Sequence, residues 1–213
     1  MQKADASFPF DLIVSAASFE SAPLARAAKE LFGWNGSTIE CGIGSLDAAY
    51  SAKELSEKLR NLRVLFVGTC GIFGRFSKPS LLRVTNVLWI PSAERAGKAY
   101  RVQGTSPEVE ISTCDSRLFR DLPTSACLCG PSISLDSGIS PPLVASQQNS
   151  HTVFTENLEL YPVAFWAVKT CNTFDALLAT TNQVGIDAHR DWRHNFQAAA
   201  DLTRDRVMGA LQR

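Results

Sequence analysis

The sequence predicts an α/β protein whose sheet is mostly parallel and buried on both faces. Short apolar runs alternate along the chain with longer stretches in which apolar residues recur at helical spacing. The runs are continuously apolar, which is typical of strands that helices cover on both sides. Strand and helix in alternation favour parallel pairing, because the helix carries the chain back to the end of the sheet at which the previous strand began.

Strand and helix alternate strictly in the first third of the chain. In order, the expected elements are a strand at 11–17, a helix at 21–32, a short strand at 37–41, a helix at 46–59 and a strand at 63–68. Leu24 and Leu31 share one face of the first helix, and Gly33 ends it. We expect Gly68 and Gly71 to close the last of these strands in a turn.

The rest of the chain continues the pattern with shorter strands. The expected elements are strands at 84–90, 126–129 and 132–135, a helix at 158–170, a strand at 177–181 and a helix at 191–211. Asn86 interrupts the first of these strands, and Asn182 ends the last. Residues 141–150 are polar and are expected to form a loop. No shift in composition marks a boundary, so we expect residues 1–213 to form one domain.

Charge and composition argue against several classes of protein. The chain has 21 Lys and Arg residues and 21 Asp and Glu residues, whereas nucleic-acid binders hold phosphate through an excess of basic charge. With 45% hydrophobic residues, the chain is not expected to be disordered. No apolar run approaches the ~20 residues that span a bilayer, and the N-terminus lacks the apolar core of a secretory signal. We therefore expect a cytoplasmic protein with no nucleic-acid or membrane partner.

The cysteines and histidines do not form a metal-binding pattern. Six cysteines are scattered along the chain without a Cys-x-x-Cys pair, and a cytoplasmic protein keeps them reduced. Cys127 and Cys129 lie two apart in an apolar run, so both thiols are expected on one buried face of a strand. His151 has no ligand spacing to the other histidines, and we expect His189 and His194 on a solvated face. No metal and no cofactor are expected.

Polar and glycine residues gather at the ends of the expected strands, where ligands bind in α/β sheets. Glu20 follows the first strand, residues 68–71 follow a later one, Asn182 follows the last, and Glu159 begins a helix. Each residue also has an ordinary structural interpretation. Glu20 can be a solvated carboxylate, Glu159 can complement a helix dipole, and Asn182 can cap or turn the chain.

Five segments, in this order, resemble the nucleoside phosphorylase/nucleosidase superfamily. They are residues 12–17 followed by Glu20, Cys41-Gly42-Ile43-Gly44 followed by Asp47-Ala48-Ala49, Val67-Gly68-Thr69-Cys70-Gly71, Asn157-Leu158-Glu159, and Thr181-Asn182. The resemblance implies a three-layer αβα sandwich with a central mixed, mostly parallel twisted sheet. It also implies a purine nucleoside as ligand and assembly into a homo-oligomer. It assigns catalysis to Glu20 and Asn182, and substrate binding to Gly68, Thr69, Gly71, Leu158 and Glu159.

Within the superfamily, the tail of the chain is most similar to the futalosine hydrolases. The run Asn182-Gln183-Val184-Gly185, followed by Arg190 and Trp192, resembles their Ser-Asn-x-Val-Gly…Arg…Trp segment. The methylthioadenosine/S-adenosylhomocysteine nucleosidases have Asp at the place of Asn182. A protonated Asp donates to the purine N7, whereas an amide both donates and accepts and so matches the N7 and O6 edge of hypoxanthine. The resemblance therefore favours a 6-oxopurine nucleoside such as futalosine, an intermediate of menaquinone biosynthesis.

The implied reaction is hydrolysis of an N-glycosidic bond. Glu20 would deprotonate the attacking water, and Glu159 would hold the ribose hydroxyls in place. A glycine turn at 68–71 would let the backbone approach the ligand closely.

Two alternatives remain open. The first is phosphorolysis, but phosphorylases carry an Arg where this chain has Phe66, and an apolar side chain does not hold phosphate, so hydrolysis is favoured. The second is a nucleoside-binding homologue without activity, because Leu158 replaces a Met of the family. Leu160 and Tyr161 stand where small residues are usual and are expected to narrow the pocket, and Gly138 stands where an aromatic residue often stacks on the base.

Overall fold

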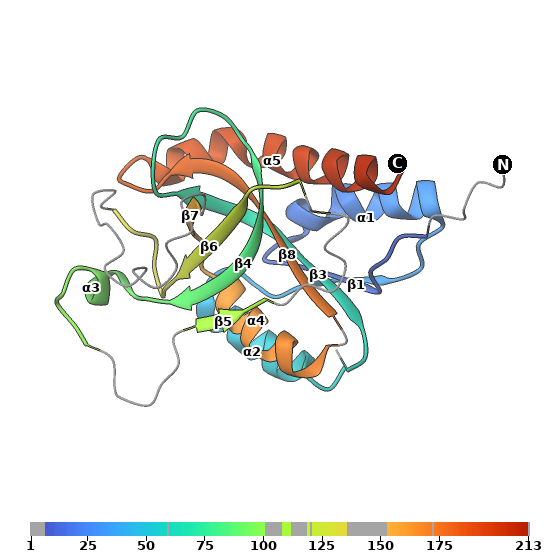
Figure 1. The fold of residues 1–213 in the computed structure, drawn as a ribbon, viewed down its shortest axis with the longest axis horizontal. Coiled ribbons are helices and arrows are strands. Elements are labelled where there is room, and N and C mark those ends of the chain that lie inside the picture. The colour runs from blue at the N-terminus through green and yellow to red at the C-terminus, as the bar shows by residue number, and fades with distance from the viewer. Residues whose placement is uncertain are drawn as a thin grey trace.

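The computed structural model describes residues 7–58, 60–100, 108–111, 119, 121–135, 153–171 and 173–212 (Figure 1). In chain order the elements are β1 (Leu12–Ser15), α1 (Ser18–Phe32), β2 (Ser37–Glu40), α2 (Ser45–Leu55), β3 (Arg63–Ile72), β4 (Leu81–Trp89), α3 (Ser92–Arg95), β5 (Glu108–Glu110), β6 (Thr124–Cys129), β7 (Val153–Glu156), α4 (Leu160–Thr170), β8 (Thr173–Gln183) and α5 (Ala188–Leu211). The fold is therefore mixed α/β around one sheet.

The sheet is mixed and partly closed. Its order is β2-β1-β3-β7-β6-β4-β5, and β8 pairs with both β3 and β4, so that β3, β8, β4, β6 and β7 form a closed circuit. Pairings β3–β7, β4–β5 and β4–β8 are antiparallel, and the other pairings between described strands are parallel. The prediction of a mixed sheet in an α/β fold is confirmed, whereas the predicted three-layer sandwich with mostly parallel pairing is not. One cause is the length of β3, because the edge that pairs with β1 continues far enough to pair with β7 in the antiparallel sense.

Helices cover both faces of the sheet, as the apolar runs predicted. Helices α1 and α5 lie side by side on one face, and α2 and α4 lie together on the other (Figure 1). Along β3, Val64 and Phe66 pack into the core beneath α2 and α4, whereas Leu65 and Val67 pack beneath α1 and α5. Because successive side chains of a strand point to opposite faces, a continuously apolar run fills both cores.

The largest error in the predicted elements concerns β3. The strand continues through Gly68 and Gly71 to Ile72, so the predicted turn is wrong. Its second half stays in the sheet because β8 pairs with it as far as Ile72 and β7 joins it at Gly71. Residues 132–135 are not a strand, and α3, β5 and β7 were not predicted. The predicted loop at 141–150 lies outside the described residues.

Two helices begin earlier than their apolar spacing indicated. Helix α1 starts at Ser18, which places Glu20 in its first turn. Helix α5 starts at Ala188, which brings His189 onto the helix. Helix α4 begins after Glu159, its N-cap residue, so that this carboxylate does stand at the start of a helix.

The cysteine prediction is confirmed for the strand pair. The thiols of Cys127 and Cys129 are buried on one face of β6, with their sulfur atoms 3.8 Å apart. In the part of the chain that the structure describes, no group of three or more His, Cys, Asp or Glu side chains is arranged to hold a metal ion. Within the same part, no helix combines the length and apolar character needed to cross a membrane.

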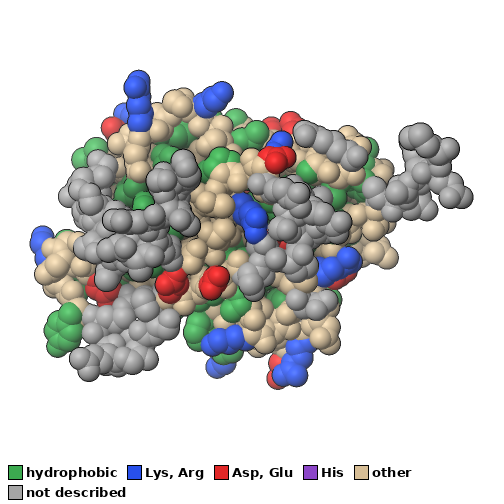
Figure 2. Space-filling model, in the orientation of Figure 1, with side chains coloured by type: hydrophobic (Ala, Val, Ile, Leu, Met, Phe, Trp, Pro, Cys, Tyr) green, Lys and Arg blue, Asp and Glu red, His purple; other side chains and the backbone are tan. Residues whose placement is uncertain are grey.

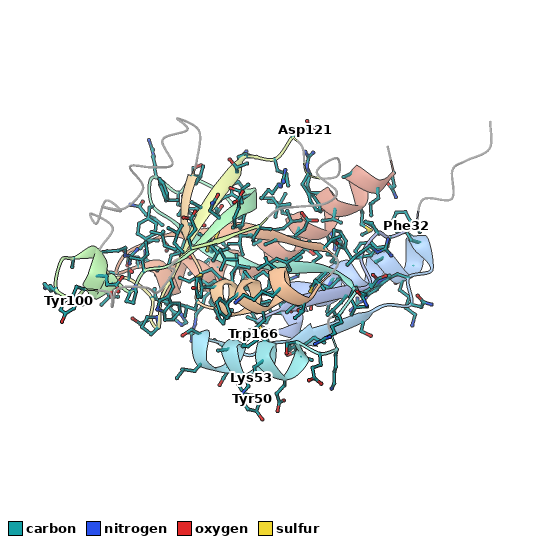
Figure 3. All side chains as sticks on the ribbon, turned by 60° about the horizontal axis from the view of Figure 1, so that its bottom comes forward. Phe32, Tyr50, Lys53, Tyr100, Asp121 and Trp166 are labelled. Atoms are coloured by element: carbon teal, nitrogen blue, oxygen red, sulfur yellow. The ribbon has the colours of Figure 1, made fainter. Side chains whose placement is uncertain are left out.

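Charged side chains of both signs are scattered over the coloured part of the face in Figure 2. The outer side of α2 is open to solvent, where Tyr50 and Lys53 point away from the sheet (Figure 3). The hydroxyl of Tyr50 donates a hydrogen bond of 2.6 Å to Glu54 on the same helix.

Candidate active site

A cavity of about 330 Å³ lies at the carboxyl ends of β1, β3 and β8, closed at its sides by the starts of α1, α4 and α5. Six of the seven residues predicted for the site line it: Glu20, Thr69, Gly71, Leu158, Glu159 and Asn182. Glu20 and Asn182, which are 162 residues apart in the sequence, therefore meet, as expected where parallel strands end. Gly68 does not line the cavity. A side chain there would meet the ring of Phe66 at 3.0 Å, so this glycine faces the core.

Glu20 is buried and held by three hydrogen bonds. The backbone N–H and the hydroxyl of Thr69 donate to its Oε1 at 2.9 Å and 3.0 Å, and the N–H of Ala16 donates to its Oε2 at 3.1 Å. Burial raises the pKa of Glu20 to about 7, and the negative charge of Glu159 adds to the rise. The hydrogen bonds act in the opposite direction but do not offset burial. Near neutral pH this carboxyl can both accept and release a proton.

Glu159 faces the same cavity from the start of α4. Its Oε1 accepts a hydrogen bond of 2.8 Å from the backbone N–H of Gly44. Gly44 has a φ of 92°, a conformation that favours glycine, and this turns its N–H toward the carboxylate. Burial raises the pKa of Glu159, while the bond from Gly44 lowers it. The segment Gly42-Ile43-Gly44 thus supports the carboxylate of Glu159.

Asn157 joins the two carboxylate sites and was not predicted as a site residue. Its Oδ1 accepts from the backbone N–H groups of Glu159 and Leu160 at 2.9 Å and 2.7 Å, which caps α4. Its Nδ2 donates to the carbonyl of Thr69 at 3.0 Å. An Asn just before an apolar helix is a recognised capping signal, so the sequence contained a sign of the first role. The link to β3 depends on the tertiary structure.

Aromatic side chains of α1 and α5 form one wall of the cavity. Trp192 donates its indole N–H to the hydroxyl of Thr69 at 3.1 Å, so it also supports the residue that holds Glu20. His189 stacks on Trp192 with ring centres 5.7 Å apart, and Phe19 meets Trp192 edge-on. The prediction for His189 is corrected in part: its side chain is exposed, but it also lines the cavity. The cause is the early start of α5.

Asn182 and Gly71 are paired across β3 and β8. A side chain added at Gly71 would lie 2.9 Å from the Nδ2 of Asn182, so the glycine provides room for this amide. Gly71 was predicted to form a turn that lets the backbone approach the ligand. It lies instead within β3, where it makes room for the side chain of Asn182. The Oδ1 of Asn182 accepts from the hydroxyl of Thr181 at 2.8 Å, and its Nδ2 donates to the carbonyl of Gln183 at 3.0 Å. The amide has two N–H groups, and among the described residues no acceptor takes the second one, which is therefore available to a ligand.

The residues expected to narrow the pocket do not line it. Leu160 is fully buried in the core, and Tyr161 packs against the ring of Trp89. Gly138 lies outside the described residues. Ile133 and Glu156 do line the cavity and were not predicted.

The carboxyl groups that line the described part of the cavity have no Lys or Arg beside them in the lining. Three carboxylates line the cavity, from Glu20, Glu156 and Glu159, whereas no described Lys or Arg does. Phe66, at the place where a phosphorylase would carry Arg, is fully buried in the core. The described part of the cavity therefore suits a neutral or cationic group better than an anion.

No protein-family model and no curated protein sequence matches the chain. Solved structures do match it over nearly its whole length. A Helicobacter pylori nucleosidase variant with 5′-methylthioadenosine in its active site has a TM-score of 0.72 at 14% identity, covering 96% of this chain and 99% of that one. The futalosine hydrolase of Helicobacter pylori has a TM-score of 0.69 at 14% identity, covering 94% of this chain and 95% of that one.

A third structure agrees with these two. The S-adenosylhomocysteine nucleosidase of Streptococcus pyogenes, in complex with 5-methylthiotubericidin, has a TM-score of 0.71 at 14% identity and covers 94% of this chain and 95% of its own. These enzymes belong to the nucleoside phosphorylase/nucleosidase superfamily. The chain therefore shares the fold of these enzymes over nearly its whole length.

Proposed function

We propose that this protein is a purine nucleosidase, which uses water to split the N-glycosidic bond of a nucleoside into free base and sugar. The observation that carries the proposal is Glu20, a buried carboxyl with a pKa of about 7 in a cavity of suitable size. The fold shared with nucleosidases of known activity supports it, and a futalosine-type 6-oxopurine nucleoside is the favoured substrate.

Glu20 acts on the attacking water. Its ionised form accepts a proton as the water oxygen approaches the anomeric carbon. Thr69 holds the carboxylate through two hydrogen bonds and so fixes the position from which it acts. The charges of Glu20 and Glu159 also favour the positive charge that develops on the ribose as the bond breaks.

Asn182 acts on the departing base. Negative charge develops on the purine as the bond breaks, and the unused N–H of the Asn182 amide can donate to N7. An amide does not supply a proton, so this arrangement suits hypoxanthine, a better leaving base than adenine. Leu158, at the edge of the cavity, offers an apolar surface to the ring.

Water is favoured over phosphate as the acceptor. A phosphate ion needs donors or cations, and the described cavity offers three carboxylates and no Lys or Arg. Formation of product should therefore not depend on added phosphate. A sugar 1-phosphate among the products would replace hydrolysis by phosphorolysis.

One incubation series tests the proposal. The protein is mixed with futalosine, inosine, adenosine, methylthioadenosine and S-adenosylhomocysteine, with and without phosphate, and free base is measured. Glu20→Gln should lower turnover by about 100-fold or more, whereas Glu30→Gln, an exposed carboxylate on the same helix, should leave it unchanged. Absence of free base from every nucleoside would favour a binding protein without activity.

A further inference from the structure

The indole of Trp192 is held in one orientation near the start of α5. Its ring stacks with those of His189 and Phe196, with ring centres 5.7 Å and 5.4 Å apart and interplanar angles of 16° and 26°. Phe19 of α1 meets the indole edge-on at 5.9 Å and meets the ring of Phe196 edge-on at 5.2 Å. Because three rings surround the indole, its N–H keeps its direction toward Thr69 of β3.

The indole N–H of Trp192 begins a chain of hydrogen bonds that ends at Glu20. It donates to the hydroxyl of Thr69 at 3.1 Å. An indole N–H can only donate, so the Thr69 oxygen is the acceptor of this bond and keeps its own proton for another partner. That partner is the Oε1 of Glu20, at 3.0 Å. Both bonds therefore run in one direction, from Trp192 through Thr69 to Glu20.

The direction of this chain favours the ionised form of Glu20. A hydroxyl that accepts one hydrogen bond donates a stronger one, because the bonds of a chain polarise one another. The backbone N–H of Thr69 adds a second donor to Oε1 of Glu20, at 2.9 Å, which fills the two acceptor positions of that oxygen. Among the described residues, Oε2 accepts one bond, from the N–H of Ala16. Oε2 is therefore the oxygen that remains available to the attacking water.

Other titratable groups surround Glu20, and none of them belongs to this chain of hydrogen bonds. They are Glu159 of α4, Glu156 of β7, His189 of α5 and the thiols of Cys41 and Cys70. Burial raises the pKa of Glu20 and the charge of Glu159 raises it further, whereas the bonds from Thr69 lower it. His189 stacks on Trp192, so a test of the indole N–H has to separate it from this imidazole.

We infer that Trp192 is a positioning residue, which fixes the hydroxyl of Thr69 and, through it, the carboxylate of Glu20. The inference rests on the proposed function, in which Glu20 accepts a proton from water. The ring and the N–H of Trp192 then have separate tasks. The ring is part of the cavity wall, where a ligand contacts it, whereas the N–H acts on Glu20 through Thr69. One side chain thus connects the wall of the cavity to the group that acts on water.

Trp192→Phe separates the two tasks, because Phe keeps an aromatic ring and lacks the N–H. This variant should lower kcat by about 2- to 10-fold, the range expected for the loss of one hydrogen bond, and should leave KM unchanged. Trp166→Phe is the matched control, because Trp166 is also partly buried but does not line the cavity, and it should change neither constant. A change in KM at unchanged kcat would overturn the inference, because it would leave the side chain only its place in the wall.

A combination of variants tests the route through Thr69. Thr69→Val has no hydroxyl, so adding Trp192→Phe to it should cause no further fall in kcat. The reason is that both substitutions interrupt the same chain of hydrogen bonds and their effects are therefore not additive. Falls in kcat that multiply would mean that Trp192 acts independently of Thr69, and would overturn the inference.

The chain of hydrogen bonds can also be observed without turnover, by proton–nitrogen correlation NMR of the indole groups. The signal of Trp192 should shift with pH in step with the titration of Glu20. This shift should vanish in Glu20→Gln and in Thr69→Val, and it should remain in His189→Gln, which removes the neighbouring imidazole. The internal controls are the other indoles of the chain, Trp34, Trp89 and Trp166.

The two kinds of measurement distinguish this inference from the proposed function. An indole signal that follows Glu20, with no nucleoside cleaved, would retain the link between Trp192 and Glu20 and remove the hydrolase activity. Cleavage of nucleosides together with an indole signal that does not follow Glu20 would overturn the inference and retain the activity. If a variant of Trp192 or Thr69 does not fold, the pH series on the unmodified protein and on Glu20→Gln decides.

Discussion

Replacing Glu20 by Gln should change how the stability of the protein depends on pH. Burial raises the pKa of Glu20 from 4.5 to about 7. The folded state therefore holds this proton more tightly than the unfolded state does between those two values, and stability falls as pH rises. The contribution is fully present below pH 4.5 and is lost above about pH 7. At 1.36 kcal/mol for each pKa unit, the loss is about 3 kcal/mol. Gln does not titrate, so Glu20→Gln lacks this loss.

The assay is urea unfolding of both proteins at about pH 5 and about pH 8, with the free energy of unfolding extrapolated to water. The variant should gain about 2–3 kcal/mol relative to the unmodified protein between the two conditions. The comparison uses the change with pH, so any constant cost of placing an amide beside the N–H of Ala16 cancels. Glu30→Gln, exposed on the same helix, serves as the control and should show no such gain. A difference between the proteins that stays constant with pH would refute the reasoning about the buried carboxyl.

Three further predictions follow from the contacts of the site. Thr69→Val removes a hydrogen bond that lowers the pKa of Glu20, so the rising limb of the pH–rate profile should move to higher pH; an unmoved limb would contradict the contact. Asn157→Ala removes the cap of α4 and should lower the free energy of unfolding by about 1–2 kcal/mol, as measured in urea. Asn182→Asp supplies an acid at N7 and should narrow the preference for inosine-type over adenosine-type nucleosides, as measured by kcat/KM on both; an unchanged ratio would remove the role of this amide.

Most of the alternation of strand and helix could be predicted because it depends on local spacing. Residues 64–67 are apolar without interruption, and a strand with that pattern has to be covered on both faces. Glu20 and Asn182 could be proposed because each follows an apolar strand, and Glu159 because it stands at the start of an apolar helix. The continuation of β3 past Gly68 could not be predicted from its glycines, because β7 and β8 hold it in the sheet.

The surroundings of Glu156, which is paired with Arg95, could not be predicted from the sequence. Its neighbours across the sheet and its ion-pair partner come from β3, α3 and the segment after β6, and no spacing along the chain connects them. The same holds for Trp192, whose contact with Thr69 spans 123 residues.

The sequence by itself determined the class of fold, the burial of the central strands on both faces and the residues that stand at strand ends. These features depend on hydrophobic periodicity and on the residues that end a strand or helix, which are properties of neighbours along the chain. The tertiary structure decided the closure of the sheet, the raised pKa of Glu20 and the pairing of Glu156 with Arg95. Each of these depends on burial and on charges from segments distant in sequence, and only the folded chain brings those segments within a few ångströms of one another.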